Sequence, residues 1–194
     1  MNDRDFAFVS SAGPLRLTAA VLFLSLTGMI SPAFAEATPS HSDVANQFEK
    51  EIAALAVEEP SESDPVSVAT AVFPAKVKVG ERAVVVIKVR MKPGWHIYAY
   101  VPSSAPYIQT RKELELPGAL RTVGEWSKPP AERLPFDQSV FVYEGDQVFV
   151  REIEAVTNGA GEQTLSAGLF YQTCKRELCL PPTQKINQLT LTVF

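Results

Sequence analysis

Residues 170–182 read Phe-Tyr-Gln-Thr-Cys-Lys-Arg-Glu-Leu-Cys-Leu-Pro-Pro and contain the only two cysteines of the chain, Cys174 and Cys179. Residues typical of strands precede Cys174 and follow Cys179, and the four residues between the two cysteines fit the tip of a hairpin. Facing residues at a non-hydrogen-bonded site of an antiparallel pair have Cα atoms about 4.5 Å apart. A disulfide accepts Cα separations of roughly 4.4–6.8 Å. These two sulfurs can therefore join and part with little movement of the backbone.

Outward from this hairpin, the chain from Val66 onward has apolar residues at a period of two. The predicted strands are rich in Val, Ile, Thr and aromatic residues and are bounded by Gly, Pro and Asn. They cover residues 66–73, 82–92, 95–100, 112–116, 139–144, 147–155, 163–172 and 183–193. Short strands at this spacing, with no comparable helix between them, predict an all-β fold. We expect an immunoglobulin-like antiparallel β-sandwich over residues 66–194.

The first 35 residues have the pattern of a secretory signal peptide. Arg4 and Arg16 precede an apolar run over residues 17–30, and small residues in Ala33-Phe34-Ala35 suit a cleavage before Glu36. The alternative is an uncleaved anchor, but a run of 14 residues is shorter than the roughly 20 that a membrane span needs. We therefore expect a periplasmic or otherwise exported protein, in a compartment where disulfides persist.

Residues 36–65 differ from the rest in charge, with eight acidic residues and one Lys. Within them, Ser42 to Val57 predicts an amphipathic helix with Ser42 as its cap, and a Pro-rich acidic linker follows. Its apolar positions are Val44, Phe48, Ile52 and Leu55. We expect a solvated spacer that docks loosely or not at all. The alternative is a handle for a partner or a membrane surface.

The strand-rich part carries fifteen Lys and Arg against twelve Asp and Glu. This weak, scattered excess excludes a nucleic-acid-binding surface as the main function. Near the cysteines, Lys175 and Arg176 stand against Glu177, and nearby positive charge favours the thiolate. A loop this small gains only about 2 kcal/mol from closure by a disulfide. The residues alone favour a structural bond and leave a redox pair open.

Two further stretches hold candidate site residues. In Trp95-His96-Ile97-Tyr98, alternation sends Trp95 and Ile97 to the core and His96 and Tyr98 to the other face. His96 and Tyr98 form either a half-buried polar rim or a pair that flanks the cysteines and adjusts their protonation. Phe136, in a Pro-flanked loop, is by itself an ordinary core residue.

A metal site is the weakest interpretation of these residues. The two cysteines with His96 and Met91 could hold a soft metal such as copper(I). Zinc sites, however, pair two closely spaced ligands with a second such pair, and the sequence has no second pair. We expect no metal and no cofactor beyond the cysteines themselves.

Several motifs together resemble the N-terminal periplasmic domain of the thiol:disulfide interchange protein DsbD family. The resemblance covers roughly residues 66–194. Its motifs are Lys92-Pro93-Gly94-Trp95-His96-Ile97-Tyr98, Leu114-Glu115-Leu116-Pro117-Gly118, Val142-Tyr143-Glu144-Gly145 and Tyr171-Gln172-Thr173-Cys174 with Cys179-Leu180-Pro181-Pro182. The last of these is the most specific.

The resemblance implies an immunoglobulin-like domain whose cysteine pair relays electrons to exported oxidised proteins, such as isomerases and cytochrome c maturation thiol proteins. It implies that Cys179 forms the mixed disulfide with partners and that Cys174 resolves it. His96 and Tyr98 take the place of aromatic residues beside the pair. Phe136 corresponds to a cap-loop residue that shields the disulfide until a partner displaces it.

The chain departs from the family at two points. Leu134 and Pro135 stand where the cap loop commonly carries acidic residues. The family's proteins continue into a membrane domain and a thioredoxin-like domain, whereas this sequence ends at Phe194, so we expect a separate membrane electron donor and thioredoxin-like exported partners. The competing hypothesis is a non-enzymatic exported binding module with a structural disulfide, which docks partners by an edge strand or the acidic helix.

Overall fold

Two four-stranded sheets face each other in the computed structural model, which describes residues 41–156, 159–176 and 178–194. One sheet has the order β1-β3-β9-β6, with β1 Val66–Phe73, β3 Arg82–Met91, β9 Asp146–Ala155 and β6 Leu120–Ser127. The other has the order β2-β13-β10-β5, with β2 Lys76–Val77, β13 Thr183–Val193, β10 Gly161–Tyr171 and β5 Arg111–Glu115. The predicted signal peptide, residues 1–35, lies outside the described residues. The predicted all-β, immunoglobulin-like sandwich is confirmed.

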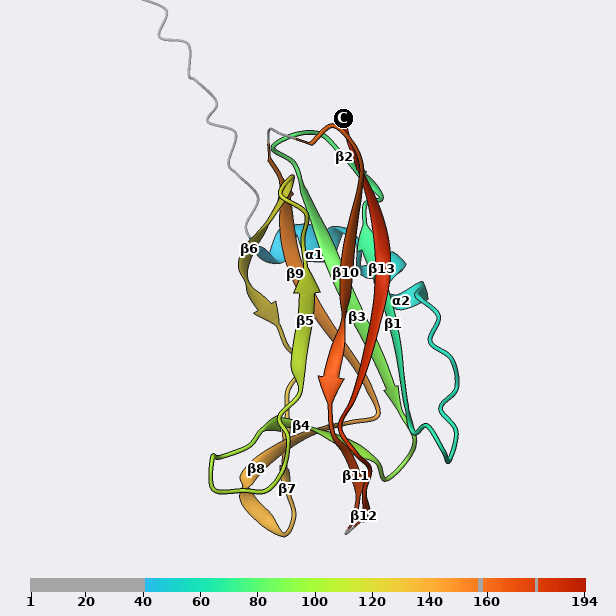
Figure 1. Cartoon of the computed structure of the whole chain (residues 1–194), viewed down its shortest axis with the longest axis vertical. Coiled ribbons are helices and arrows are strands. Elements are labelled where there is room, and N and C mark those ends of the chain that lie inside the picture. The colour runs from blue at the N-terminus through green and yellow to red at the C-terminus, as the bar shows by residue number, and fades with distance from the viewer. Residues whose placement is uncertain (1–40, 157–158, 177) are drawn as a thin grey trace, which may run out of the picture. The chain divides into compact units, whose positions relative to one another are not determined.

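A third sheet closes one end of the sandwich, at the bottom of Figure 1. Its order is β12-β11-β4-β8-β7, with β12 Leu178–Cys179, β11 Thr173–Lys175, β4 His96–Tyr100, β8 Asp137–Glu144 and β7 Glu132–Leu134. Strand β10 continues into β11 after Gln172, and β3 continues into β4 through a turn at Gly94, whose φ of +80° suits glycine. Two core strands thus extend into the sheet that carries the cysteines.

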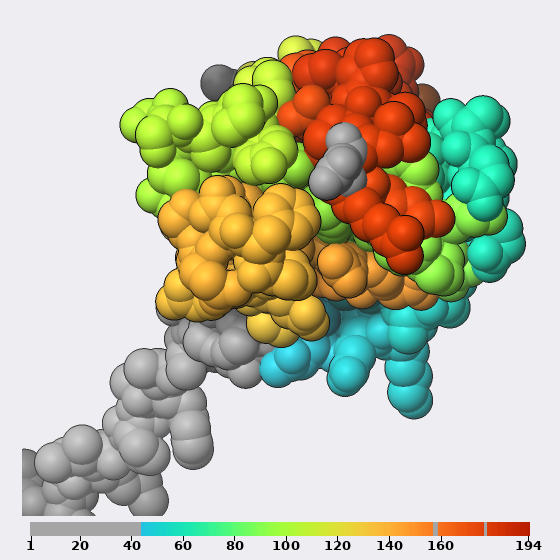
Figure 2. Space-filling view, turned by 90° about the horizontal axis from the view of Figure 1, so that it is seen from below, coloured from blue at the N-terminus to red at the C-terminus, as the bar shows by residue number. Residues whose placement is uncertain are grey.

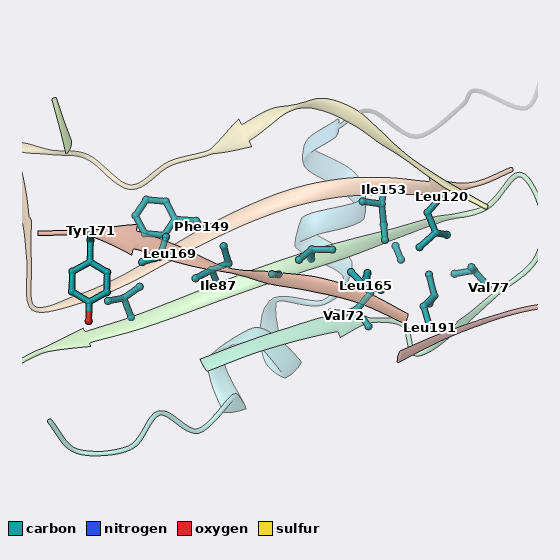
Figure 3. Packing of buried hydrophobic residues seen from close by; sticks show 14 of the residues in the cluster. Val72, Val77, Ile87, Leu120, Phe149, Ile153, Leu165, Leu169, Tyr171 and Leu191 are labelled. Carbon is teal, nitrogen blue, oxygen red and sulfur yellow. The ribbon is translucent and has the colours of Figure 1, made fainter. Parts of the chain in front are cut away.

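The main core lies between the two four-stranded sheets (Figure 3). In β3, Val85, Ile87 and Val89 are fully buried on the inner face. Facing strands contribute residues such as Phe149 and Leu169. This period-two burial is what the alternating sequence predicted for a sandwich.

The eight-residue strand β6 was missed by the sequence analysis. Because β6 is an edge strand, only its Leu120 is buried and its other residues are mostly exposed. Its register against β9 shifts between Val123 and Ser127, next to Gly124 with its φ of +62°. An interrupted, half-exposed edge strand has no clean alternation to read.

The N-terminal helices pack on the sandwich, which corrects the expectation of a loose spacer. Instead of one helix over 42–57, α1 spans His41–Gln47 and α2 spans Glu49–Ala54, and Ser42 lies within α1 rather than ahead of it. Their apolar side chains cover the outer face of the β1-β3-β9-β6 sheet. The contacting residues are Val44, Phe48, Ile52 and Leu55 on one side and Phe73, Val84, Val86, Val148 and Val150 on the other.

Cations on the same face of β3 hold the acidic linker. Lys88 Nζ donates to the carbonyl oxygens of Ala53, in the last turn of α2, and Leu55, just after it, at 2.8 and 2.9 Å. Arg90 pairs with Glu59, and Lys92, just after the strand, pairs with Glu62. Glu59 and Glu62 of the acidic linker are therefore paired with cations on β3 or just after it. Within the described ranges, no helix combines the length and apolar character that a membrane crossing needs.

Candidate functional site

The cysteine hairpin forms where the sequence predicts it, with Cα atoms slightly closer than the expected range of roughly 4.4–6.8 Å. Cys174 and Cys179 pair across β11 and β12, form a disulfide and have Cα atoms 4.1 Å apart. Lys175 pairs with Leu178, so the chain reverses within two residues, and Arg176 takes a left-handed φ of 53°. Two-residue hairpin turns need such positive φ values. The cysteines therefore sit at the base of a tight hairpin tip.

The two sulfur-bearing residues differ in exposure. Cys174 has none of its surface exposed and packs with Tyr98, Leu134 and Val142 in a second hydrophobic cluster. Cys179 is exposed, on the edge strand of the third sheet. Another protein can therefore approach Cys179, whereas Cys174 is closed off from solvent.

Tyr98 lies beside the disulfide. Its Oη is 4.0 Å from Cys179 Sγ, and its ring stacks on that of Tyr107 with centroids 4.7 Å apart. Tyr98 is 1% exposed, so the half-buried rim considered from the sequence is wrong for this residue. Burial raises the pKa of its hydroxyl above the usual value of 10.0. Tyr98 therefore stays protonated and is available as a hydrogen-bond donor to sulfur at neutral pH.

His96 is buried as well, at 4% exposure, which corrects the same expectation. It pairs with Cys174 on one side and Glu144 on the other, and its ring meets that of Tyr98 edge-on at 5.3 Å. Its Nδ1 is 4.0 Å from Glu144 Oε1. Burial lowers the pKa of His96 below 6.5, so the imidazole is neutral at pH 7.

Phe136 is not an ordinary core residue, because 64% of its surface is exposed. It lies in the turn between β7 and β8 and lines a cavity of about 550 Å³ together with Tyr107, Arg176 and Cys179. Gln138 Nε2 spans the turn and donates to the carbonyl oxygens of Leu134 and Pro135, both at 3.2 Å. Beside it, the Asp137 carboxylate accepts hydrogen bonds from the backbone N–H and hydroxyl of Ser139. These bonds lower the pKa of Asp137. An exposed apolar side chain on this turn thus shares a cavity with Cys179.

The comparison with protein families identifies the chain. The family model described as "Thiol:disulfide interchange protein DsbD, N-terminal" matches residues 62–191. The chain belongs to this family. It carries the disulfide-bonded cysteine pair of a thiol:disulfide interchange domain. The resemblance stated from the motifs is thereby confirmed, and the N-terminal helices lie ahead of the matched residues.

Solved structures of related domains align with the chain at low identity. The N-terminal periplasmic domain of ScsB from Proteus mirabilis matches at 16% identity and a TM-score of 0.43, covering 71% of this chain and 50% of that one. The reduced DsbD N-terminal domain of Neisseria meningitidis matches at 17% identity and a TM-score of 0.38, covering 66% of this chain and 84% of that one. The complex of DsbD and PilB N-terminal domains from the same organism matches at 15% identity and a TM-score of 0.40, covering 67% of this chain and 89% of that one. This chain thus spans half the length of the ScsB chain, and no curated protein matches it.

In this DsbD-family chain, Tyr107 is the site residue that sequence analysis missed. It belongs to the segment between β4 and β5, which is tied down where Thr110 N donates to Tyr98 O and Ile108 N donates to Gln172 Oε1. The segment has no hydrophobic periodicity, so its sequence gives no sign that it covers Tyr98. Figure 2 looks at this end of the molecule, where the segment (yellow-green), the β7–β8 hairpin (orange) and the cysteine hairpin (red) come together.

The remaining candidates are divided between this face and the core. Arg176 is exposed at the hairpin tip, and Lys175 is half-buried, with its Cε near Gly94. Met91 packs in the main core and not in the cluster that contains Cys174. Among the described residues, no group of three or more His, Cys, Asp or Glu side chains is arranged to hold a metal ion.

Proposed function

We propose that this chain is an exported thiol:disulfide oxidoreductase domain that relays two electrons through Cys174 and Cys179. A separate membrane or thioredoxin-like donor reduces the pair, and thioredoxin-like exported proteins accept the electrons. The observation that carries the proposal is the unequal exposure of the two cysteines in a domain of the DsbD family. An exposed sulfur for partners beside a buried sulfur for resolution is what a two-step exchange requires.

The relay begins at Cys179. In the reduced domain its thiolate attacks a partner's disulfide, a Cys179–partner bond forms, and one partner sulfur leaves with the electron pair. The Cys174 sulfur then attacks Cys179 Sγ, the internal disulfide forms, and the second partner sulfur leaves as thiolate. Two electrons pass to the partner, and the two protons lost by the domain balance those taken up by the partner's thiols. Reduction of the domain by its donor is the same sequence reversed.

The neighbours of Cys179 have separate roles in this proposal. Tyr98 donates a hydrogen bond to the Cys179 thiolate and stabilises it. Phe136 is a cap that limits access to Cys179 and is displaced by the partner. Lys175 and Arg176 add positive charge at the tip, which favours the thiolate and partners with acidic surfaces. Residues 1–35 direct export to the periplasm, and no metal or small-molecule cofactor takes part.

Trapping of a covalent intermediate tests the proposal. A Cys174→Ala variant cannot resolve the mixed disulfide, so mixing it with an oxidised thioredoxin-like exported protein should give a complex that survives denaturing electrophoresis and disappears with reductant. Cys179→Ala is the matched control and should give none. Equal trapping by both variants, or by neither, contradicts the proposed relay.

A further inference from the structure

Four residues form a continuous row across the third sheet. Cys179 pairs with Cys174 across β12 and β11, Cys174 pairs with His96 across β11 and β4, and His96 pairs with Glu144 across β4 and β8. Directly opposite residues of antiparallel strands point to the same face, with Cβ atoms about 4.5–5.5 Å apart. The row leads from an exposed cysteine, through a buried cysteine and a buried histidine, to a glutamate side chain that is 48% exposed.

The geometry points to His96 as the proton acceptor of Cys174, with Glu144 as the group that connects His96 to solvent. This inference rests on the proposed function and adds to it a residue that serves the resolving step. Cys174 must lose its proton before its sulfur attacks Cys179, because the thiolate is the nucleophile. Cys174 is fully buried, so no base in solution reaches it directly.

The state of His96 suits this task. His96 Nε2 is buried and has no hydrogen-bond partner among the described residues. A buried polar atom without a partner is uncommon in folded proteins and needs an explanation. Burial also lowers the pKa of His96, so the imidazole is neutral and can accept a proton at pH 7. Once protonated, the ring would have the Glu144 carboxylate 4.0 Å from its Nδ1.

Among the described residues, few other titratable groups surround His96. On the same strand, the ring of Tyr98 meets His96, and burial raises the pKa of the Tyr98 hydroxyl. This hydroxyl stays protonated and does not compete for the proton of Cys174. From β8 the group is Glu144, and from β11 it is Cys174. The neighbouring Thr173 donates its hydroxyl to the His96 carbonyl oxygen at 2.9 Å and fixes the backbone of the row. Leu134 and Pro135 carry no carboxylate, and the Asp137 carboxylate that follows them is bonded to Ser139. Glu144 and His96 are therefore the acid–base groups in the row.

The resolving step balances with these groups. The proton of the Cys174 thiol passes to His96, the Cys174 sulfur forms its bond to Cys179, and the Cys179–partner bond breaks. The electron pair of that bond leaves on the partner sulfur. His96 then returns its proton to solvent past Glu144. In the opposite direction, the Cys174 sulfur leaves Cys179 as a thiolate, and protonated His96 supplies its proton.

The test uses the reduced protein and DTNB, an aromatic disulfide that releases one coloured thiolate at each of the two steps. The first release reports attack by Cys179, and the second reports resolution by Cys174. In the wild-type protein the rate of the second release should fall only when the pH drops through the pKa of His96, which lies below 6.5. If the wild-type rate instead follows a thiol of pKa about 8.5, the inference is wrong.

Variants separate this role from a structural one. With His96→Phe, the second release at pH 7 should be about 10²-fold slower, at the low end of what general acid–base catalysis contributes, while the first release is unchanged. Glu144→Gln, at an exposed position, should slow the second release less and leave folding intact. His41→Gln, at the only other histidine of the chain, is the matched control and should change neither. Equal second rates in His96→Phe and the wild type overturn the inference without affecting the proposed relay, which trapping tests separately.

Discussion

The hydroxyl oxygen of Tyr98 lies 4.0 Å from the sulfur of Cys179, although 81 positions separate the two residues in the chain. The contact joins β4 to the edge strand β12 across the buried Cys174. It also explains why a tyrosine is buried at the end of the sandwich, since its hydroxyl finds a polarisable partner there.

Tyr98→Phe should slow the reaction of Cys179 with an alkylating reagent in the reduced protein. Loss of one hydrogen bond of about 0.5–1.5 kcal/mol would raise the thiol pKa and reduce the rate two- to tenfold at pH 7 (about 1 kcal/mol being a factor of five). The pH dependence of iodoacetamide alkylation measures this. A curve that coincides with the wild type would mean that the hydroxyl does not act on the sulfur.

Phe136→Ala should speed reduction of the disulfide by dithiothreitol, by about two- to tenfold, because exchange rates depend on access to the attacked sulfur. Phe194→Ala is the matched control, since Phe194 is 61% exposed and lies at the opposite end of the sandwich in Figure 1. Both variants should keep wild-type stability. Equal reduction rates in Phe136→Ala and Phe194→Ala would remove the cap role.

Phe48→Ala should destabilise the whole domain, because Phe48 packs on Phe73, with ring centroids 6.3 Å apart, and on the outer face of β3. A fully buried Phe→Ala costs about 3–5 kcal/mol, so a half-buried one should cost about 1–3 kcal/mol. Urea unfolding measures the loss, with the exposed neighbour Gln47→Ala as control. If Phe48→Ala unfolds like the control, the helices contribute nothing to the stability of the sandwich.

The strand pattern predicted most of the sandwich and the cysteine hairpin. Alternation also placed Ile97 in the main core and Tyr98 on the other face. It could not predict the burial of His96 and Tyr98, because the segment that covers Tyr98 has no periodicity. Nor did it predict the docked helices, although the unbroken apolar run from Ala83 to Ile87 signals a strand buried on both faces.

His96 should make stability depend on pH. Burial depresses its pKa in the folded state, so the unfolded chain binds the proton more readily. The stability that neutral His96 contributes is therefore fully present above 6.5, the pKa of His96 in the unfolded chain. It is lost as the pH falls through the lower pKa of His96 in the folded protein. Between pH of about 7 and about 5, the free energy of unfolding should fall more in the wild type than in His96→Phe. Parallel curves would mean that His96 titrates alike in both states.

The reduction potential of the Cys174–Cys179 disulfide tests the central claim most directly, because it separates a working redox pair from a structural bond without a partner. Equilibration of the protein with glutathione and dithiothreitol buffers, followed by quantification of free thiols, gives this value. A redox pair with an exposed Cys179 should have a potential above about −300 mV. A potential below that value, resistant to the glutathione buffer, would contradict the relay and leave a binding module with a structural disulfide.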